Sequence, residues 1–541
     1  MRTARKSDSG LSVRAFAGTH VVLLGFDITP EKRKGLLGFA IHRTDKDADR
    51  ADWLQGMLFF PNHRGDAGEQ GGTDQFPIQK FRWGDYTATP THHYTYRVSA
   101  MYGKPGDLKP GPTVSVDVQT EDPSNVGGGP HQVHFNRSAA ASQAYVRRFG
   151  DVSPELVPGK AAFTWLSRGL EESLVAFIER AVDATWALYL NVYEFQKDNF
   201  LEALKDAGKR GVTLEIMFDA IKKASGPRQK NLSAIAKHNI AQKYLKPREH
   251  LASISHDKFM VLCHNGQPVA VWTGSTNFTD GGIYGQANVG HAVEDSALAA
   301  KYLALHKALW NGTAPDPGLA ASRTIAEQLS PVPPGGKPAI YPIFSPRTGT
   351  VAIATCKNLI DHAHDLVCIT VPFQLHADLD AALSDAKNAF LKFALLNTSG
   401  TVVEAVHRDT DNRVAAAARL KTKLDQFQQE SLHHTGVYIH TKYILVDPLS
   451  DVPTVVTGSA NFSTNSCINN DENQLVISGN TAVADVYLGE FMRMFDHYMF
   501  RDLMARAKKQ PKILALAEDD SWTAKYFAGG PEERDRKAFS S

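Results

Sequence analysis

Two stretches of the chain place a histidine and a lysine two residues apart, directly before a run of apolar residues. They are "SHDKFMVLC", with His256 and Lys258, and "IHTKYILVD", with His440 and Lys442. Apolar, β-branched and aromatic residues without Gly or Pro are typical of a strand, in which residues i and i+2 share a face. Each imidazole is therefore expected to point the same way as the neighbouring ammonium group, toward one negatively charged group.

The two stretches belong to one longer repeat. With an offset of 184 residues, the segments around His256 and His440 align without a gap. The residues that recur in pairs are His256 and His440, Lys258 and Lys442, Gly274 and Gly458, Ser275 and Ser459, and Asn277 and Asn461. Packing alone would preserve the apolar pattern but gives no reason to keep these polar side chains. Their presence in both copies therefore indicates shared chemistry.

These residue types suit the cleavage of a phosphodiester. One histidine can attack phosphorus to form a covalent phosphohistidine. The other can protonate the leaving oxygen and then activate water or an alcohol. Lys258 and Lys442 would offset charge on the phosphoryl oxygens. The remaining polar side chains would bond to those oxygens or hold the lysines: Ser275, Ser459, Asn277 and Asn461. This chemistry needs no metal ion, and we expect neither a metal site nor a cofactor.

The pattern H-x-K-x4-D-x10-G-S-x-N resembles the HKD motif of the phospholipase D superfamily. "GSTNFT" and "GSANFS", followed by "NDEN", are most similar to the PLD-like, Nuc-type bacterial branch. The resemblance covers residues of about 160 to 500. It implies two tandem α/β/α lobes whose motifs meet at a pseudo-twofold axis. It also implies a metal-independent phosphodiester hydrolase with a phosphohistidine intermediate, complete within a monomer.

The two copies differ at the last position of the motif. Asp447 completes the second copy, whereas Cys263 occupies the equivalent position of the first. We expect Cys263 to be a small buried residue behind the strand. Asp447 is assigned to the support of the site, either beside the substrate phosphate or as a structural residue.

The copies also differ where a side chain could orient each histidine. Glu472 follows His440 by 32 residues, and the equivalent residue of the first copy is Asn288, with Gln286 nearby. A carboxylate bonded to an imidazole raises its pKa, whereas an amide adds no charge. If Glu472 orients His440, then His440 suits the general acid and His256 the nucleophile. The alternative is that the carboxylate reaches across to His256.

The pattern of elements predicts four regions. Residues 1–150 read as an immunoglobulin- or fibronectin-like β-sandwich. Alternating strand and helix patterns predict a first lobe over 160–328 and a second over 338–510, with mostly parallel sheets. The first lobe is expected to open with a strand at 161–167, and the Pro/Gly-rich segment 330–338 to link the lobes. Residues 511–541, with Trp522, Tyr526 and Phe527, are expected to pack on the catalytic unit.

Composition leaves the substrate open. The 541 residues carry a formal charge of +1 and four scattered cysteines, which predict neither a zinc site nor a disulfide scaffold. The lack of an apolar leader or membrane-length run predicts a soluble, cytoplasmic protein. Residues 222–248 contain eight Lys/Arg and no Asp/Glu, which suits a polyanion or an anionic membrane contact. A phospholipid head group is the leading substrate. The alternatives are a DNA or RNA nuclease and a non-catalytic binding module.

Overall fold

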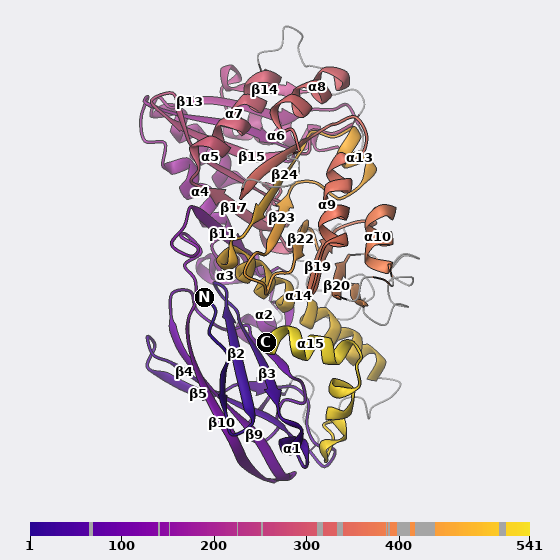
Figure 1. Cartoon of the computed structure of the whole chain (residues 1–541). Helices are drawn as coiled ribbons and strands as arrows, with labels where there is room; N and C mark the ends of the chain where they lie inside the picture. Colours follow the sequence, from indigo (N-terminus) through magenta and orange to yellow (C-terminus); the bar gives the residue numbers. More distant parts are fainter. Residues whose placement is uncertain are drawn as a thin grey trace.

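The computed structural model places two mixed α/β lobes beside an N-terminal β region (Figure 1). It describes residues 1–63, 69–138, 141–150, 152–223, 226–249, 253–310, 318–332, 339–385, 387, 390–397, 412–416, 439–507 and 515–541. Most of the predicted linker, residues 333–338, lies outside the described residues. Among the described helices, none combines the length and the apolar character that a membrane span requires.

The N-terminal region contains two antiparallel sheets of four strands each. The first has the order β1 (Lys6–Asp8), β2 (Leu11–Ala17), β3 (Val22–Ile28) and β8 (Arg82–Asp85). The second has the order β10 (Asp107–Gln119), β9 (His93–Lys104), β4 (Gly38–Asp45) and β5 (Arg50–Trp53). Side chains of both sheets share one hydrophobic core. An immunoglobulin- or fibronectin-like identity stays a prediction.

Each lobe is built on a seven-stranded sheet, and the two sheets have equivalent strand orders. The first is β11 (His131–Phe135), β17 (Val289–Val293), β16 (Gln267–Gly274), β15 (Lys258–His264), β12 (Trp186–Val192), β13 (Thr213–Asp219) and β14 (Leu245–Arg248). The second is β18 (Ile340–Ser345), β24 (Glu472–Ser478), β23 (Thr454–Gly458), β22 (Tyr443–Val446), β19 (Leu366–Val371), β20 (Leu391–Leu396) and β21 (Asn412–Ala416). The sequence repeat is therefore a repeat of the fold.

The sheets are mixed, so the expectation of mostly parallel strands is wrong. In the first lobe only β12, β13 and β14 pair in parallel, and the other neighbours are antiparallel. The reason lies in the motif itself. Asn265 and Gly266, both with positive φ, join β15 to β16 as a tight hairpin, and a hairpin makes antiparallel neighbours.

The first strand of the first lobe is not where the sequence placed it. Residues 161–167 form a helix, α3 (Ala161–Ser167), because Ala162 and Leu166 bury one face against the lobe's core. The edge position equivalent to β18 belongs to β11 instead, which pairs with β17. The domain limits stay predictions. One detail differs from them: β11 falls within the predicted N-terminal domain, residues 1–150, but lies in the sheet of the first lobe.

Helices cover both faces of each sheet. Three helices pack on the outer face of the first sheet: α4 (Leu170–Glu179), α5 (Asp198–Lys209) and α6 (Arg228–His238). On the outer face of the second lie α9 (Val351–Asp361), α10 (Ala377–Ser384) and α13 (Thr464–Ile468). Between the sheets, α7 (Ser296–Trp310) and α14 (Thr481–Ala507) share one core with the inner faces of both. The remaining helices are α1 (Pro30–Arg33), α2 (Ser142–Phe149), α8 (Leu319–Leu329) and α15 (Pro531–Ser540). The lobes are therefore held as one unit.

The C-terminal segment packs mainly on the N-terminal sheets rather than on the lobes. Trp522 and Tyr526, in a 3-10 turn at Asp520–Phe527, belong to the core of the N-terminal region. The indole of Trp522 stacks on Phe81, and its N–H donates to the Leu36 carbonyl at 2.9 Å. The rings of Phe39 and Phe81 form the aromatic surface that attracts this segment.

Candidate active site

The two His-Lys pairs lie at the starts of equivalent strands. Lys258 is the first residue of β15, and His256 precedes it; β22 begins at Tyr443, directly after Lys442. The strand expected at 439–447 is therefore shorter than predicted. All four side chains are buried. The pKa of His440 is lowered by burial and then by Lys442, Lys258 and His256, so the four groups lie in one site.

Two short backbone contacts between the lobes bring the pairs together. Ser255 forms a parallel bridge with Asp471, and Ala287 forms one with Ile439. The His256 N–H donates to the Asp471 carbonyl at 2.9 Å. In the equivalent contact, the His440 N–H donates to the Ala287 carbonyl at 3.1 Å. Each bridge pairs the residue that precedes a histidine in one lobe with the residue that precedes the orienting residue in the other lobe.

The carboxylate of the second lobe consequently serves the histidine of the first. Glu472 accepts from His256 Nδ1 at 2.8 Å. It also accepts from Ser459 Oγ at 2.7 Å and from Ser466 Oγ at 2.5 Å. The prediction that Glu472 orients His440 is wrong, and the alternative of a carboxylate that reaches across is what the structure has. With Nδ1–H donated to a carboxylate, the lone pair of neutral His256 lies on Nε2.

The amide of the first lobe likewise serves the histidine of the second. Asn288 Nδ2 donates to the Gly282 carbonyl at 2.8 Å, which fixes the orientation of the amide. Its Oδ1 therefore accepts, from Ser275 Oγ at 2.8 Å and from His440 Nδ1 at 2.9 Å. Neutral His440 then also carries its lone pair on Nε2. Gln286, the other candidate, uses its backbone carbonyl to accept from Asn136.

The two motif serines hold these orienting residues. Ser275 donates to Asn288 and Ser459 donates to Glu472, both fully buried. They were expected on the phosphoryl oxygens or the lysines. The physical reason for the difference is position. Each serine follows the glycine that ends its strand, Gly274 or Gly458, and the neighbouring strand of the same lobe starts at the orienting residue Glu472 or directly after the orienting residue Asn288.

Burial sets the charge state of the site. It lowers the pKa of His256 to about 4 even though Glu472 opposes the shift. Burial lowers the pKa of Lys258 to about 8 and that of Lys442 well below its usual range. Burial alone would raise the pKa of Glu472, but His256 and Lys258 together bring it below its ordinary value. Both imidazoles are therefore neutral at neutral pH. A bound anion would stabilise the charged form of each lysine.

The lysines donate to the backbone of their own motifs. Lys258 Nζ bonds to the His256 carbonyl at 2.9 Å, and Lys442 Nζ bonds to the His440 carbonyl at 2.7 Å. Asn277 and Asn461 occupy equivalent positions, and within the described structure neither side-chain carbonyl oxygen has a hydrogen-bond partner. Both lobes therefore bring an ammonium group and an amide to the site.

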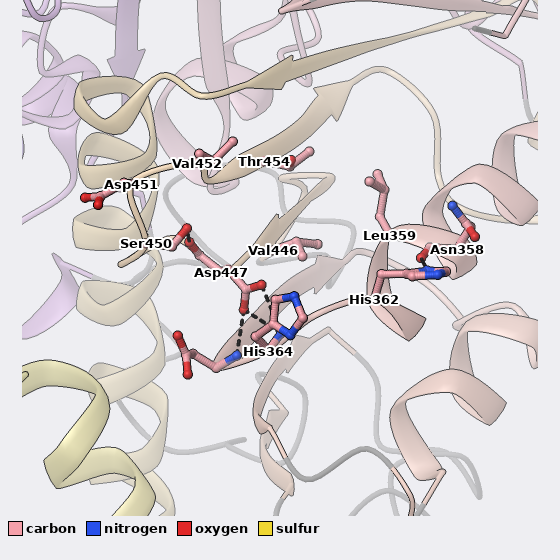
Figure 2. A pocket seen from close by; sticks show the side chains of 11 residues that line it. Asn358, Leu359, His362, His364, Val446, Asp447, Ser450, Asp451, Val452 and Thr454 are labelled. Carbon is pink, nitrogen blue, oxygen red and sulfur yellow. Dashed lines mark hydrogen bonds between the residues drawn. The ribbon is translucent and has the colours of Figure 1, made fainter. Parts of the chain in front are cut away.

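Asp447 lies away from this site, at the far end of β22 (Figure 2). Its carboxylate accepts from three consecutive backbone N–H groups, those of His364, Asp365 and Leu366, at 2.8 to 3.1 Å. It lines an open pocket of about 660 Å³ on this side of the lobe. Asp447 thus fastens the loop before β19, which is the structural alternative. Cys263, its counterpart, is buried in the central core as expected.

Sequence reasoning missed three contributors. Asn136, just after β11, accepts from the Asn288 N–H at 2.9 Å and donates to the Ile283 and Gln286 carbonyls at 2.7 and 2.6 Å. It therefore fastens the loop that carries the orienting amide. Tyr193 lies edge-on to His256, with ring centroids 4.8 Å apart. Ser466 donates to Glu472, as described above. Only Ser466 lies near a recognised motif, so the other two gave no signal.

A buried ion pair adds a further contact between the lobes. Arg248 donates to both carboxylate oxygens of Asp471, at 2.7 and 3.0 Å, and neither side chain is more than 2% exposed. Asp471 precedes Glu472 and also accepts from the His256 N–H. The pair therefore fixes the segment that aims the carboxylate at His256.

One group among the described residues has the composition of a metal site, and it lies in the N-terminal region. Ligand atoms of Asp45, Asp47 and His92 lie within 4.8 Å of one another. Asp45 accepts from the Asp47 and Ala48 N–H groups, and both its oxygens lie 3.0 Å from His92 Nδ1. The cluster is thus accounted for as a turn held by its own side chains.

The chain is similar to several solved structures of low sequence identity. No curated protein matches the chain significantly. Among solved structures, polyphosphate kinase from Porphyromonas gingivalis is 10% identical with a TM-score of 0.39, over 58% of this chain and 46% of that one. Phosphatidylserine synthase from Haemophilus influenzae is 10% identical with a TM-score of 0.44, over 64% and 92%. Nuc from Salmonella typhimurium is 21% identical with a TM-score of 0.23, over 30% and 96%. The chain spans less than half the length of the kinase.

A family model gives the assignment. The model described as "Cardiolipin synthase, PLD-like domain" matches residues 175–310 and again 356–495, which together exceed half of the chain. Each match contains one His-Lys pair and the orienting residue of its lobe. The choice of the Nuc-type branch within the superfamily stays a prediction. The chain belongs to the cardiolipin synthase, PLD-like domain family, and thus to the phospholipase D superfamily.

Proposed function

We propose that the protein cleaves phosphodiesters through a covalent phosphohistidine on His256. The observation that carries the proposal is the crossed pair of contacts, Glu472 to His256 and Asn288 to His440. It leaves two neutral imidazoles whose Nε2 atoms take no part in these two contacts, next to two lysines. Lys442 Nζ lies 3.2 Å from His440 Nε2. Attack by Nε2 gives the imidazole a positive charge, which the Glu472 carboxylate offsets. His440 has no carboxylate partner among the described residues, so its imidazolium gives up a proton more readily. We therefore keep the roles expected from the sequence for a different reason: the carboxylate stabilises the charged nucleophile and not the acid.

In the first step, His256 Nε2 forms a bond to phosphorus while the bond from phosphorus to the leaving oxygen breaks. His440 is protonated on Nε2 in the substrate complex, because the negative charge of the bound phosphate raises its pKa. The leaving oxygen takes this Nε2 proton, which leaves His440 neutral. In the second step, water or an alcohol gives a proton to His440 and its oxygen attacks phosphorus, which releases His256. Lys258 and Lys442 bind the phosphoryl oxygens, with Asn277 and Asn461 donating beside them. No metal ion takes part in this scheme.

The leading substrate is a phospholipid, with cleavage on the head-group side of its phosphate. The description of the matched family model names a lipid enzyme, cardiolipin synthase, which supports this choice. Hydrolysis and transfer to an alcohol share the phosphohistidine and differ only in the acceptor. We propose hydrolysis, by a monomer that contacts membranes peripherally. A cytoplasmic location also remains our proposal.

A nuclease is the second candidate, because of one feature near the site. Lys222, Lys223, Lys230 and Lys237 are exposed, the last two on α6. Burial raises the pKa of the Glu194 carboxyl, and Lys258, Lys230 and a hydrogen bond with Asn277 oppose this rise. Lys230 therefore acts electrostatically on the same carboxyl as Lys258 of the catalytic site. A basic surface that continues into the catalytic site suits a polyanionic strand.

The test compares wild type with His256→Ala and His440→Ala in EDTA. One assay follows head-group release from vesicles of phosphatidylcholine and phosphatidylglycerol, and the other follows nicking of plasmid DNA. His362→Ala is the matched control, since this histidine is exposed and belongs to the pocket of the second lobe. We expect head-group release that both active-site variants lose and the control keeps.

Each result bears on a different part of the proposal. Nicking that depends on both histidines, without head-group release, would replace the lipid by nucleic acid. Activity that survives in both variants would reject the site. A wild type that acts on neither substrate, nor on a bis(p-nitrophenyl) phosphate probe, would favour the binding-module alternative.

A further inference from the structure

A second group of basic side chains lies where the N-terminal sheets meet the two lobes. This junction cluster consists of Arg137, Arg168, Arg493, His20 and His134. His20 lies in the turn between β2 and β3, His134 on β11 and Arg137 just after it, Arg168 at the end of α3, and Arg493 on α14. Figure 1 shows β11, α3 and α14 gathered above the N-terminal sheets. Four separate segments of the chain therefore contribute to one cluster.

Two of the arginines form a buried floor. The side chains of Arg168 and Arg493 are 4% and 8% exposed. Both contact Glu490 Oε2, Arg168 through Nη2 at 2.6 Å and Arg493 through Nε at 2.8 Å. Arg168 Nε also donates to the Phe135 carbonyl at 2.9 Å. These contacts hold the two guanidinium groups in fixed positions.

The other members form a rim that solvent reaches. Arg137 is half-buried; its Nη1 donates to the Trp165 carbonyl at 2.7 Å, and the guanidinium lies 4.6 Å from the centre of the Trp165 ring. His20 and His134 are also half-buried. The pKa of His20 is lowered well below its usual value by burial, then by Arg168, Arg137, His134 and Arg493.

Positive charge in the junction cluster exceeds negative charge. Among the described residues, Glu490 is the carboxylate that forms ion pairs with Arg168 and Arg493, and Arg137 forms no ion pair with a described residue. Burial, together with Arg168 and Arg493, lowers the pKa of Arg137 to about 9. Buried charges without counter-charges are costly, and a bound anion would offset this cost. The cluster contrasts with the catalytic site, where Glu472 is part of the machinery.

We propose that the junction cluster is a second anion-binding site, which takes a tetrahedral oxyanion of the phosphate type. Guanidinium groups bind phosphate with paired N–H donors in a fixed fork. Arg168 and Arg493 share Glu490, and Arg493 Nη1 donates to the Arg137 carbonyl at 3.3 Å, so the three arginines are neighbours. Arg137, which stacks on Trp165, would cover the anion from one side, while Arg168 and Arg493 would bind it from the other. Neutral His20 and His134 can each donate one further N–H.

The site is connected to the catalytic histidine by hydrogen bonds. Arg493 Nη2 donates to the Asn136 carbonyl at 3.2 Å. Asn136 in turn accepts from the Asn288 N–H, and Asn288 accepts from His440 Nδ1. A change in the position of Arg493 on anion binding would therefore reach the residue that orients His440. The proposal concerns binding and does not depend on which phosphodiester the protein cleaves.

Isothermal titration with inorganic phosphate at constant ionic strength tests the proposal. The full-length proteins are wild type, Lys442→Met, Arg137→Gln and, as matched control, Arg147→Gln on the exposed face of α2. We expect two phosphates per wild-type chain. Lys442→Met should keep the junction phosphate, Arg137→Gln should weaken it at least about tenfold, and Arg147→Gln should bind as wild type. Thermal unfolding in chloride checks that each variant is folded.

Two outcomes would overturn the proposal. One is a single phosphate per wild-type chain that Lys442→Met abolishes. The other is a second phosphate whose affinity Arg137→Gln leaves unchanged. If Arg137→Gln does not fold, Arg137→Lys keeps the charge but loses the fork and should show the weaker binding. Glycerol 3-phosphate and vesicles with phosphatidic acid then distinguish a soluble phosphate from a lipid source, since binding of either that requires Arg137 supports the site.

Discussion

The two lobes have the same strand order but supply different partners to the histidines. The first lobe offers the amide of Asn288 and the second the carboxylate of Glu472, and each crosses to the histidine of the other lobe. Neither lobe can build a complete site on its own, because its histidine is oriented from outside. In the proposed mechanism, the repeated residues supply the nucleophile, the acid and the positive charge, and the two orienting residues that differ distinguish the roles of the histidines.

The largest expected effect removes the histidines one at a time. Both His256→Ala and His440→Ala should lower kcat by about 10³- to 10⁴-fold on a substrate with an alkoxide leaving group. A p-nitrophenolate leaving group needs no general acid in the first step. With that substrate His440→Ala should therefore recover the burst of p-nitrophenolate that accompanies phospho-enzyme formation, while His256→Ala should not. Trapping of a phospho-enzyme by acid quench checks the nucleophile directly. A phospho-enzyme in His256→Asn would reverse the roles.

The next effect tests the difference between the two orienting residues. Glu472→Gln removes the charge that offsets the imidazolium, and kcat should fall by about 10²- to 10⁴-fold. Asn288→Asp places a carboxylate beside His440 and should raise the pKa of this histidine, so that His440 releases its proton less readily. Rapid-quench measurement of phospho-enzyme formation distinguishes the two variants from each other. Equal losses, with unchanged pH profiles, would show that the asymmetry has no catalytic meaning.

Asn136 should matter only through the amide that it holds. Asn136→Ala frees the loop before Asn288 and should lower kcat by about tenfold, with KM nearly unchanged, because the lysines that bind the phosphate stay in place. Steady-state kinetics with both parameters resolved checks this prediction. The burst of p-nitrophenolate from the activated substrate should lose less, because the first step needs no general acid there. A uniform loss on both substrates would indicate a purely structural role.

The pKa of Lys258 predicts an alkaline limit. Its ammonium group is needed in the protonated form, and burial lowers its pKa to about 8, so kcat/KM should fall as pH rises through about 8. Lys258→Arg keeps its charge over this range, so the part of the fall that Lys258 causes should disappear even if the plateau is lower. Burial also lowers the pKa of Lys442, and the part of the fall that Lys442 causes should remain. Lys230→Arg, at an exposed position on α6, is the control and should retain the wild-type limb.

The smallest effect on activity concerns Asp447. Asp447→Asn should leave kcat within about twofold, since the residue fastens a loop far from the two histidines, but should lower the free energy of unfolding by about 2 kcal/mol. Denaturant unfolding and kinetics on the same sample separate these effects. Cys263→Asp in the other lobe is the reverse change and should destabilise the protein, because it places a carboxylate in the central hydrophobic core.

The sequence by itself determined the repeated fold and the chemical inventory. Strand and helix patterns recur on both sides of the linker, and the polar pairs recur with them, because local periodicity and residue type need no knowledge of distant contacts. The prediction of two PLD-like repeats is confirmed. The burial of Cys263 was also predicted from the sequence, and the structure confirms it. The catalytic roles stay predictions, although the structure brings the predicted residues together.

Only the tertiary structure decided which residue serves which histidine. The crossing depends on two bridges between segments more than 150 residues apart, Ser255 with Asp471 and Ala287 with Ile439, and no local pattern encodes such a pairing. The same holds for β11, which fills a sheet edge from outside the repeat. A side chain such as Asn136 acquires its role from the loop it meets, and that meeting exists only once both lobes are packed around one core.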